Sequence, residues 1–365
     1  MQNVFTEERW SSLAADWTAW WNHDTDRPML TASRAINPAR KRAAWWGLLP
    51  TVPFEITPEE IAEEIWQGIL NTEYAGDLFP SAFTNFGPGD VIGFIGGGVV
   101  PAHNTTWFNA GIWEGKGLRE IKPVYDPDNR WLKRVHAVMR ACVEKFDGRA
   151  LVSFSDLGGN LDIAAPLRDT QTLLMDTLDD PDAVRELVGR ITKLWLKYYD
   201  DEYEIIRRGG RGCRSWLPLW APGSTYNLQC DFSYMIGPEQ FAELVMPDLE
   251  ACCEHIEYPF FHLDGPGILT HLDMLLSIPK LRGIQWFAGD WNADRGMPSC
   301  KWTEVLDRIL AAGKLIQMHG SFNDFIALAK ERPLKNFALD VVYDLPPGVP
   351  LNDALAEIWR VNKSV

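Results

Sequence analysis

The chain alternates short apolar runs with long amphipathic segments over most of its 365 residues. Each apolar run is bounded by glycine, proline or a charged residue, which is typical of strands buried on both faces. The runs occupy residues 27–33, 149–156, 214–220, 258–264, 282–289, 313–320 and 337–344. Because helical patterns separate them, this order predicts strand–helix units joined in one parallel sheet.

The helical patterns show apolar residues on one face and begin with helix-start signals. Residues 57–60 read Thr-Pro-Glu-Glu, which combines a capping residue, a first-turn proline and early acids. The patterns occupy residues 56–71, 128–146, 180–206, 237–256, 301–313 and 352–362. We therefore expect a single (β/α)8 TIM barrel over residues 27–365, preceded by an N-terminal helical extension over residues 1–26. A doubly wound sheet is the alternative, but the glycine-rich segment 93–100 lacks the spacing of a dinucleotide-binding turn.

Composition narrows the class of partner. The formal net charge of −15 argues against nucleic acid and anionic membranes, because neutralising phosphates requires a basic surface. The first residues do not read as a signal peptide, and no apolar run reaches eighteen residues, so a cytoplasmic protein is expected. Six cysteines without CxxC spacing favour free thiols in a reducing compartment. The 17 tryptophans either fill a large core or line a cavity.

Active sites of such barrels lie at the carboxyl ends of the strands. Polar and aromatic residues concentrate there in this sequence. They are Ser33, Arg34, Ser155, Asp156, Trp220, His262, Asp264, Gln285, Trp286, His319 and Asp340 or Tyr343. We expect the active site to be built from this set.

His262 and Asp264 are the strongest candidates for chemistry. Side chains two residues apart on a strand point to the same face, so these two converge. With His319 they offer two nitrogens and one carboxylate to a divalent metal and leave one position open for a substrate. Two other interpretations stay open. His262 and Asp264 could act as a general acid and base without metal, or His262 could only orient a loop.

Other residues are candidates for substrate binding or proton transfer. The segment 155–162, Ser-Asp-Leu-Gly-Gly-Asn-Leu-Asp, is unusually polar for a turn, which makes Asp156 a candidate catalytic acid and Asn160 a candidate ligand contact. Arg34 could hold a substrate carboxylate or phosphate by forked hydrogen bonds. The remaining candidates, for which a place in the core is the alternative, are Asn85, Trp107, Trp220, Tyr226, Gln285 and Trp286.

The order of segments resembles a known superfamily. The stretches CDFSYMIGPEQFAELVMPDLEACCEHI (230–256), YPFFHLDGPG (258–267) and LLSIPKLRGIQW (275–286) are similar to the second half of the uroporphyrinogen decarboxylase-like superfamily. That superfamily includes corrinoid-dependent methyltransferases. Weaker similarity extends through residues 156–163 back to residues 74–89. The resemblance implies a TIM barrel with either methyltransferase or decarboxylase activity.

The sequence departs from both branches of that superfamily. Its methyltransferases hold zinc with a His-x-Cys turn and a later cysteine, whereas the matching positions here are His262, Asp264 and His319. These harder ligands suit a metal that activates water, hydroxyl or carboxylate rather than a thiolate. The decarboxylases carry paired arginines after the first strand and an essential aspartate; this chain offers the single Arg34, with Asp77 in about the place of the aspartate.

The leading interpretation is a metal-dependent methyltransferase or demethylase that acts on a small polar molecule. Zinc is the expected metal, Asp264 and Asp156 are the catalytic acids, and a corrinoid protein and a second copy of the chain are the candidate partners. The first alternative is a metal-free decarboxylase, in which Arg34 anchors a carboxylate and Asp77 or Asp264 stabilises the cation. A carbohydrate-active barrel with Asp156 and Asp264 as its acids, and a non-catalytic binding barrel, remain as further alternatives.

Overall fold

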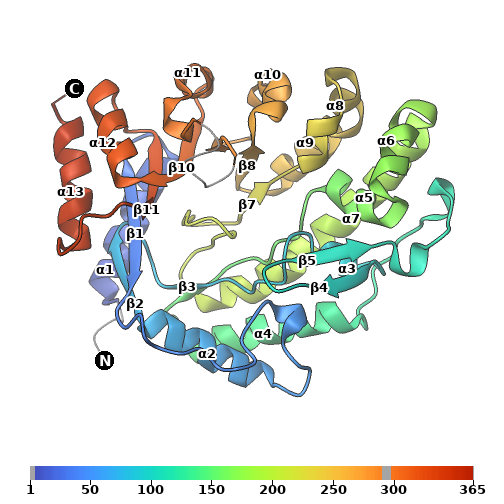
Figure 1. The fold of residues 1–365 in the computed structure, drawn as a ribbon, viewed down its shortest axis with the longest axis horizontal. Helices are drawn as coiled ribbons and strands as arrows, with labels where there is room; N and C mark the ends of the chain where they lie inside the picture. Colours follow the sequence, from blue (N-terminus) through green and yellow to red (C-terminus); the bar gives the residue numbers. More distant parts are fainter. Residues whose placement is uncertain (1–4, 290–296, 365) are drawn as a thin grey trace.

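The computed structural model describes residues 5–289 and 297–364 (Figure 1). Its main sheet has seven strands in the order β2-β1-β11-β10-β9-β8-β7. Neighbours from β1 through β11 to β7 run parallel, and β2 pairs antiparallel with β1. The strands are β1 Met29–Ala35, β2 Thr72–Gly76, β7 Thr225–Leu228, β8 Tyr258–Asp264, β9 Gly283–Phe287, β10 Leu315–Ser321 and β11 Phe337–Tyr343.

A second, shorter wall faces the main sheet. It consists of the parallel pair β3 (Ser81–Ala82) and β6 (Leu151–Val152). Beyond β6 the chain continues extended, and the Phe154 amide donates to the Arg214 carbonyl at 3.1 Å. A separate hairpin of β4 (Gly98–Pro101) and β5 (Thr106–Asn109) lies over this side (Figure 1).

Helices cover the outside of both walls. In Figure 1 the helices from α8 to α13 follow the main sheet, while α2, α4 and α7 lie along the other wall. The helices are α1 Glu7–Trp21, α2 Pro58–Leu70, α3 Val91–Phe94, α4 Arg130–Phe146, α5 Asn160–Arg168, α6 Thr170–Asp179, α7 Pro181–Ile206, α8 Pro238–Leu244, α9 Met246–His255, α10 Leu272–Ser277, α11 Thr303–Ala311, α12 Phe322–Glu331 and α13 Leu351–Asn362. The predicted Thr57 signal does cap α2, in a full capping box with Glu60.

The two faces of each strand have different neighbours. On β8, Phe261 and Leu263 belong to the large apolar cluster that includes the surrounding helices. Phe260, on the opposite face, instead joins a cluster with residues from both walls, such as Leu151 of β6 and Leu315 of β10. Because side chains alternate along a strand, His262 and Asp264 share the inner face with Phe260.

Helix α1 supplies much of the apolar part of the interior. Trp17, Trp20 and Trp21 are buried in the cluster that also holds Phe260. Trp20 packs edge-on against Trp21 with ring centroids 5.0 Å apart, and lies 6.3 Å from the ring of Phe260. At this end of the barrel-like interior, tryptophans therefore fill the core instead of lining a ligand cavity.

The α/β barrel-type fold predicted from the strand–helix alternation is confirmed, with three differences. The sheet was predicted to be wholly parallel, but the additional edge strand β2 pairs antiparallel with β1. In the described residues the walls do not join into one closed hydrogen-bonded barrel. The run 214–220, predicted as a strand, is a loop whose ends meet in a single antiparallel bridge between Cys213 and Ala221. The strand that follows this loop and pairs with β8 is β7. Leu217 and Leu219 are buried in the interior apolar cluster, which accounts for the hydrophobicity that imitates a strand.

Two expectations about the whole chain can be compared with the structure. All six cysteines are buried free thiols, as their spacing predicted. Among the described residues, no helix has both the length and the apolar character needed to cross a membrane.

Candidate functional site

The inner face of the main sheet carries polar side chains where the strands approach their carboxyl ends. His262 of β8 is paired in register with Gln285 of β9, and His319 of β10 with Asp340 of β11. Thr31 of β1 is in register with Asp340. The structure therefore brings the predicted residues His262, Gln285 and His319 onto one surface, as parallel strands require of residues at their ends.

Asp231, His262 and Asp264 form a cluster that could hold a metal ion. One ligand atom from each lies within 4.8 Å of the others, and His262 Nε2 is 3.8 Å from Asp264 Oδ2. Metal–ligand bonds of about 2.0–2.1 Å would place tetrahedral ligand atoms roughly 3.4 Å apart, so the ligand atoms of the cluster would approach one another by up to about 1.4 Å around an ion. One imidazole and two carboxylates fit a divalent cation such as zinc.

The charges of this cluster favour a cation. Burial would lower the pKa of His262, but the nearby carboxylates of Asp264 and Asp231 raise it overall. Withdrawal from water raises the pKa of Asp231, and the charge of His262 opposes this. The side chain of Asp264 is 39% exposed and Asp231 also reaches solvent, so a ligand can approach from outside.

Asp231 is the site residue that sequence reasoning missed. It follows β7, separated from the strand only by Gln229 and Cys230, and begins the short helical turn Asp231–Met235. Asp162 of α5 fixes this turn, because its carboxylate accepts hydrogen bonds from the amides of Asp231 at 3.0 Å and Phe232 at 2.7 Å. The feature that could have located Asp231 was the strand at residues 225–228. It was not predicted, because the apolar run 214–220 was assigned as the strand of this unit.

Asp156 belongs to the same region. Its carboxylate accepts hydrogen bonds from the Gly158 amide at 3.1 Å and from Gln229 Nε2 at 3.4 Å. Burial raises the pKa of Asp156 to about 6, the Gly158 hydrogen bond and the charge of His262 lower it, and Asp231 raises it. A carboxyl with a pKa near 6 can exchange protons readily at neutral pH.

A continuous hydrogen-bonded row runs from His262 across four more strands. His262 Nδ1 lies 2.5 Å from Gln285 Oε1, and Gln285 Nε2 lies 2.8 Å from His319 Nε2. His319 Nδ1 is 2.9 Å from Asp340 Oδ2, and the Thr31 hydroxyl donates to Asp340 Oδ1 at 2.7 Å.

The row also accounts for the role of His319, which sequence analysis predicted to be a metal ligand. Both of its ring nitrogens are hydrogen-bonded, one to Gln285 and one to Asp340. The ligand-atom cluster found in the described residues contains Asp231 instead. The structure therefore places His319 behind Gln285, outside the set of three groups that could hold the ion.

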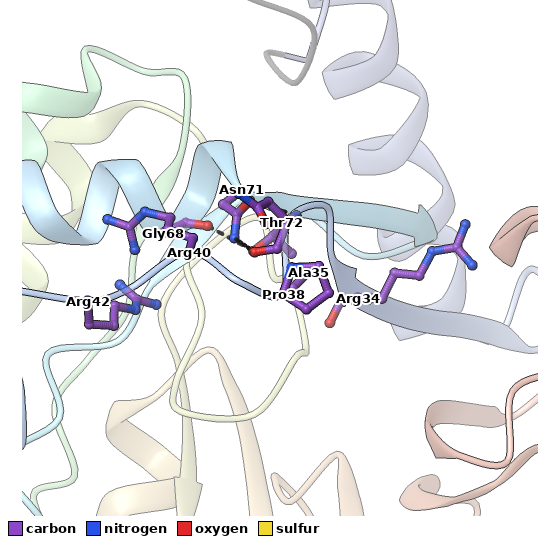
Figure 2. A pocket seen from close by; sticks show the side chains of 10 residues that line it. Arg34, Ala35, Pro38, Arg40, Arg42, Gly68, Asn71 and Thr72 are labelled. Atoms are coloured by element: carbon purple, nitrogen blue, oxygen red, sulfur yellow. Dashed lines mark hydrogen bonds between the residues drawn. The ribbon is translucent and has the colours of Figure 1, made fainter.

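Two predicted residues of the decarboxylase interpretation lie in other surroundings. Asp77 is buried in a bidentate ion pair with Arg27, at 2.8 Å for both oxygens, and accepts from the Leu30 amide at the start of β1. Arg34 is exposed and paired with Glu73 at 2.7 Å. It lines a cavity of about 420 Å³ with Arg40 and other residues after β1 (Figure 2).

Three further candidates are also separate from the cluster. Asn85 is exposed and caps its own turn by accepting from the Gly87 amide at 3.1 Å. Trp107 is 66% exposed on the hairpin strand β5. Asn160 is buried, where its amide donates to Asp248 and to Thr192.

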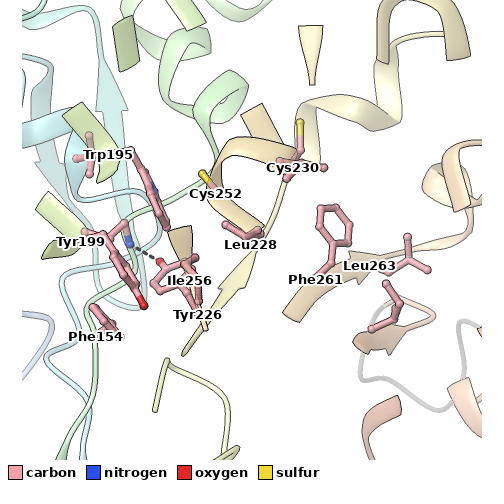
Figure 3. Packing of buried hydrophobic residues seen from close by; sticks show 14 of the residues in the cluster. Phe154, Trp195, Tyr199, Tyr226, Leu228, Cys230, Cys252, Ile256, Phe261 and Leu263 are labelled. Atoms are coloured by element: carbon pink, nitrogen blue, oxygen red, sulfur yellow. Dashed lines mark hydrogen bonds between the residues drawn. The ribbon is translucent and has the colours of Figure 1, made fainter. Parts of the chain in front are cut away.

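The remaining aromatic candidates are core residues. Trp220 packs with α1 and accepts the indole hydrogen bond of Trp21 at its carbonyl, at 2.7 Å. Trp286 faces the helices, opposite Gln285, and donates to the Ser299 carbonyl at 3.2 Å. Tyr226 is fully buried with Trp195 and Tyr199 (Figure 3). Its hydroxyl accepts from the amide of Leu157, so it supports the segment that carries Asp156.

The architecture and this strand-end site define an α/β barrel-type protein, and comparison with solved structures agrees. The chain superposes on a methyltransferase from Methanosarcina mazei with a TM-score of 0.60 and 11% sequence identity, over 96% of this chain and 98% of that one. At this level of identity the likeness concerns the fold. Comparisons with protein-family models and with curated protein sequences give no match.

Proposed function

We propose that the chain is an enzyme that transfers a methyl group to or from a small polar molecule. We further propose that it binds a divalent metal, with zinc as the first candidate, through Asp231, His262 and Asp264. The observation that carries the proposal is this cluster of one imidazole and two carboxylates at the ends of neighbouring strands. The overall likeness to a methyltransferase supports the type of reaction. His319, a metal ligand in the prediction from the sequence, is in this proposal a hydrogen-bond partner of Gln285.

A divalent ion in this cluster would supply Lewis-acid activation of the oxygen that receives or releases the methyl group. In the transfer, the bond from the methyl carbon to its donor breaks as the bond to the acceptor forms. The proton of the acceptor then passes to the carboxylate of Asp156. Asp156 suits this role because its pKa near 6 leaves it ionised at neutral pH yet able to hold a proton. A corrinoid carried by a partner protein remains the candidate methyl donor.

The alternatives have weaker support. Metal-free decarboxylation needs a cationic anchor and an acid near the substrate, but Arg34 is paired with Glu73 and Asp77 with Arg27. Hydrolysis of a sugar could use Asp156 and Asp264, yet the third acidic group, Asp231, beside His262 favours a cation. We therefore retain methyl transfer as the proposed function.

Elemental analysis of protein purified without chelators tests the metal. We expect about one divalent ion per chain in the wild type and loss of the ion in Asp231→Ala and His262→Ala, because each change removes one of three ligands. Asp273→Ala, which removes an exposed acid paired with Arg308, is the matched control and should keep the ion. A folded wild type without metal would reject this part of the proposal, and methyl donors would then be tested without it.

A further inference from the structure

The hydrogen-bonded row from His262 to Asp340 bears on metal binding, because it determines which ring nitrogen of His262 carries a proton. A histidine binds a metal through an unprotonated nitrogen, and the proton on the other nitrogen is held by a hydrogen-bond acceptor. His262 Nε2 faces Asp264, so the metal-binding form needs the proton on Nδ1. The partner of Nδ1 is Gln285, whose amide has an acceptor end and a donor end. Which end faces His262 therefore decides whether its Nε2 can bind a cation.

The two histidines on either side of Gln285 determine the orientation of its amide. Its nitrogen lies 2.8 Å from His319 Nε2, and its oxygen lies 2.5 Å from His262 Nδ1. An amide nitrogen can only donate, so His319 Nε2 must accept and must carry no proton. The proton of neutral His319 is then on Nδ1, where Asp340 Oδ2 accepts it at 2.9 Å. A carboxylate can only accept, so Asp340 fixes the direction of the whole row.

We infer that Gln285 is a positioning residue, oriented by the His319–Asp340 pair, that holds His262 in the form whose Nε2 can bind a metal. This inference rests on the proposed metal site and assigns Gln285 and His319 a role there. Reversal of the amide would present its NH₂ group to His262 Nδ1 and leave the His262 proton on Nε2. The cluster with Asp231 and Asp264 would then lose its nitrogen ligand.

The centre of the row is buried, while the side chains of His262, His319 and Asp340 are 16%, 13% and 17% exposed. Gln285 is 1% exposed, and it lies between the outward-facing Ile284 and Trp286, which are both fully buried. The ring of Trp216 packs edge-on against His262 with centroids 5.1 Å apart. At the buried Gln285, breaking one hydrogen bond of the row would leave a polar group without a ready replacement partner, so the arrangement of donors and acceptors there is directional.

The neighbouring strand provides a matched control. Gln317 of β10 is in register with Gln285, is also 1% exposed, and has no hydrogen-bond partner for its amide among the described residues. Gln285→Leu and Gln317→Leu therefore make the same chemical change on the same inner face. Only the first breaks the row.

Zinc titration by calorimetry with each purified, metal-free protein tests the inference. We expect Gln285→Leu to weaken zinc binding about 10- to 100-fold, which is the usual effect of losing the partner of a ligating histidine. Gln317→Leu should bind zinc like the wild type, and Gln285→Glu, which keeps an acceptor toward His262, should bind it far better than Gln285→Leu. Equal weakening in both leucine variants, or none in Gln285→Leu, would overturn the inference. If Gln285→Leu does not fold, Gln285→Met carries the same expectation.

Nitrogen-15 spectra of the histidine rings separate this inference from the proposed function. In the neutral ring of His319 we expect the proton on Nδ1 whether or not zinc is present. A proton on Nε2 would overturn the row even in a protein that binds zinc. A wild type that binds no zinc but shows the Nδ1 proton would reject the metal proposal and retain the hydrogen-bonded order of the row.

Discussion

Burial has a large effect on the pKa values of carboxyl groups in this protein, and Asp248 is an example. Asp248 is buried beside Asn160 and accepts a hydrogen bond from the Thr192 hydroxyl at 2.7 Å. Burial raises the pKa of Asp248 to about 7, although its bonds to Thr192 and Cys252 lower it. Asn160, predicted to face a substrate, thus has its amide donor committed to a structural network. Its position on a polar turn could be seen in the sequence, but the direction of its side chain could not.

Replacement of Asp248 by asparagine should stabilise the protein at alkaline pH. The raised pKa means that the folded state holds the Asp248 proton more tightly than the unfolded state, so wild-type stability falls as pH rises from about 4 through 7. Asparagine keeps an acceptor oxygen but has no charge to bury. We expect the free energy of unfolding of Asp248→Asn to increase relative to that of the wild type by roughly 1–4 kcal/mol as the pH rises from 4 to 8. Urea unfolding at both pH values measures it; a pH-independent difference would contradict it.

At the scale of elements, α1 and β7 show how tertiary contacts give helices and strands their roles. Helix α1 shows two acids in its first turn and a Thr6 cap, which are local signals. Its buried tryptophans pack against strand residues such as Phe260, more than 200 positions away, as Trp20 and Trp21 do. Strand β7 is only four residues long, and its pairing with β8 identifies it more clearly than its sequence does.

Removing one tryptophan ring from α1 should destabilise the whole fold. Trp20 is fully buried among Trp17, Trp21 and Phe260. We expect Trp20→Ala to lower the free energy of unfolding by about 3–5 kcal/mol, because a large cavity replaces the ring. Trp107→Ala, on the exposed hairpin strand, should change it by less than about 0.5 kcal/mol. Chemical denaturation compares the two, and equal effects would show that α1 does not support the core.

For the molecule as a whole, the candidate metal site joins the ends of two adjacent strands. Asp231 follows β7, while His262 and Asp264 lie on β8. Asp231 lies 31 positions before His262 in the sequence, so the three groups come together only in the folded chain, and an ion held by all three would bind the folded state preferentially. Ligand binding of this kind adds stability according to the ratio of free ligand to Kd.

Zinc should therefore raise the thermal unfolding midpoint. At a free concentration near 100 times Kd, the gain is about 2.7 kcal/mol, which corresponds to a shift of several degrees. Asp231→Asn should lose most of this shift because it removes a ligand charge. Differential scanning calorimetry with and without a chelator measures both proteins. A rise of equal size in Asp231→Asn would place the zinc elsewhere on the chain.

The sequence by itself determined the periodicity, the strand–helix order and the identity of the His262–Asp264 pair. These follow from local rules: side chains alternate along strands, apolar residues repeat on helix faces, and polar residues gather at strand ends. Local rules also misled at 214–220, where an apolar loop fills the interior and resembles a strand.

Only the tertiary structure decided which polar residues meet. Asp231 joins His262 because β7 pairs with β8, and His319 stands behind Gln285 because β9 lies between β8 and β10. The folded structure also places Arg34 and Asp77 in ion pairs with Glu73 and Arg27, apart from the cluster of candidate metal ligands. The physical reason is that strand order and register bring together residues far apart in the chain, and no local preference contains that information.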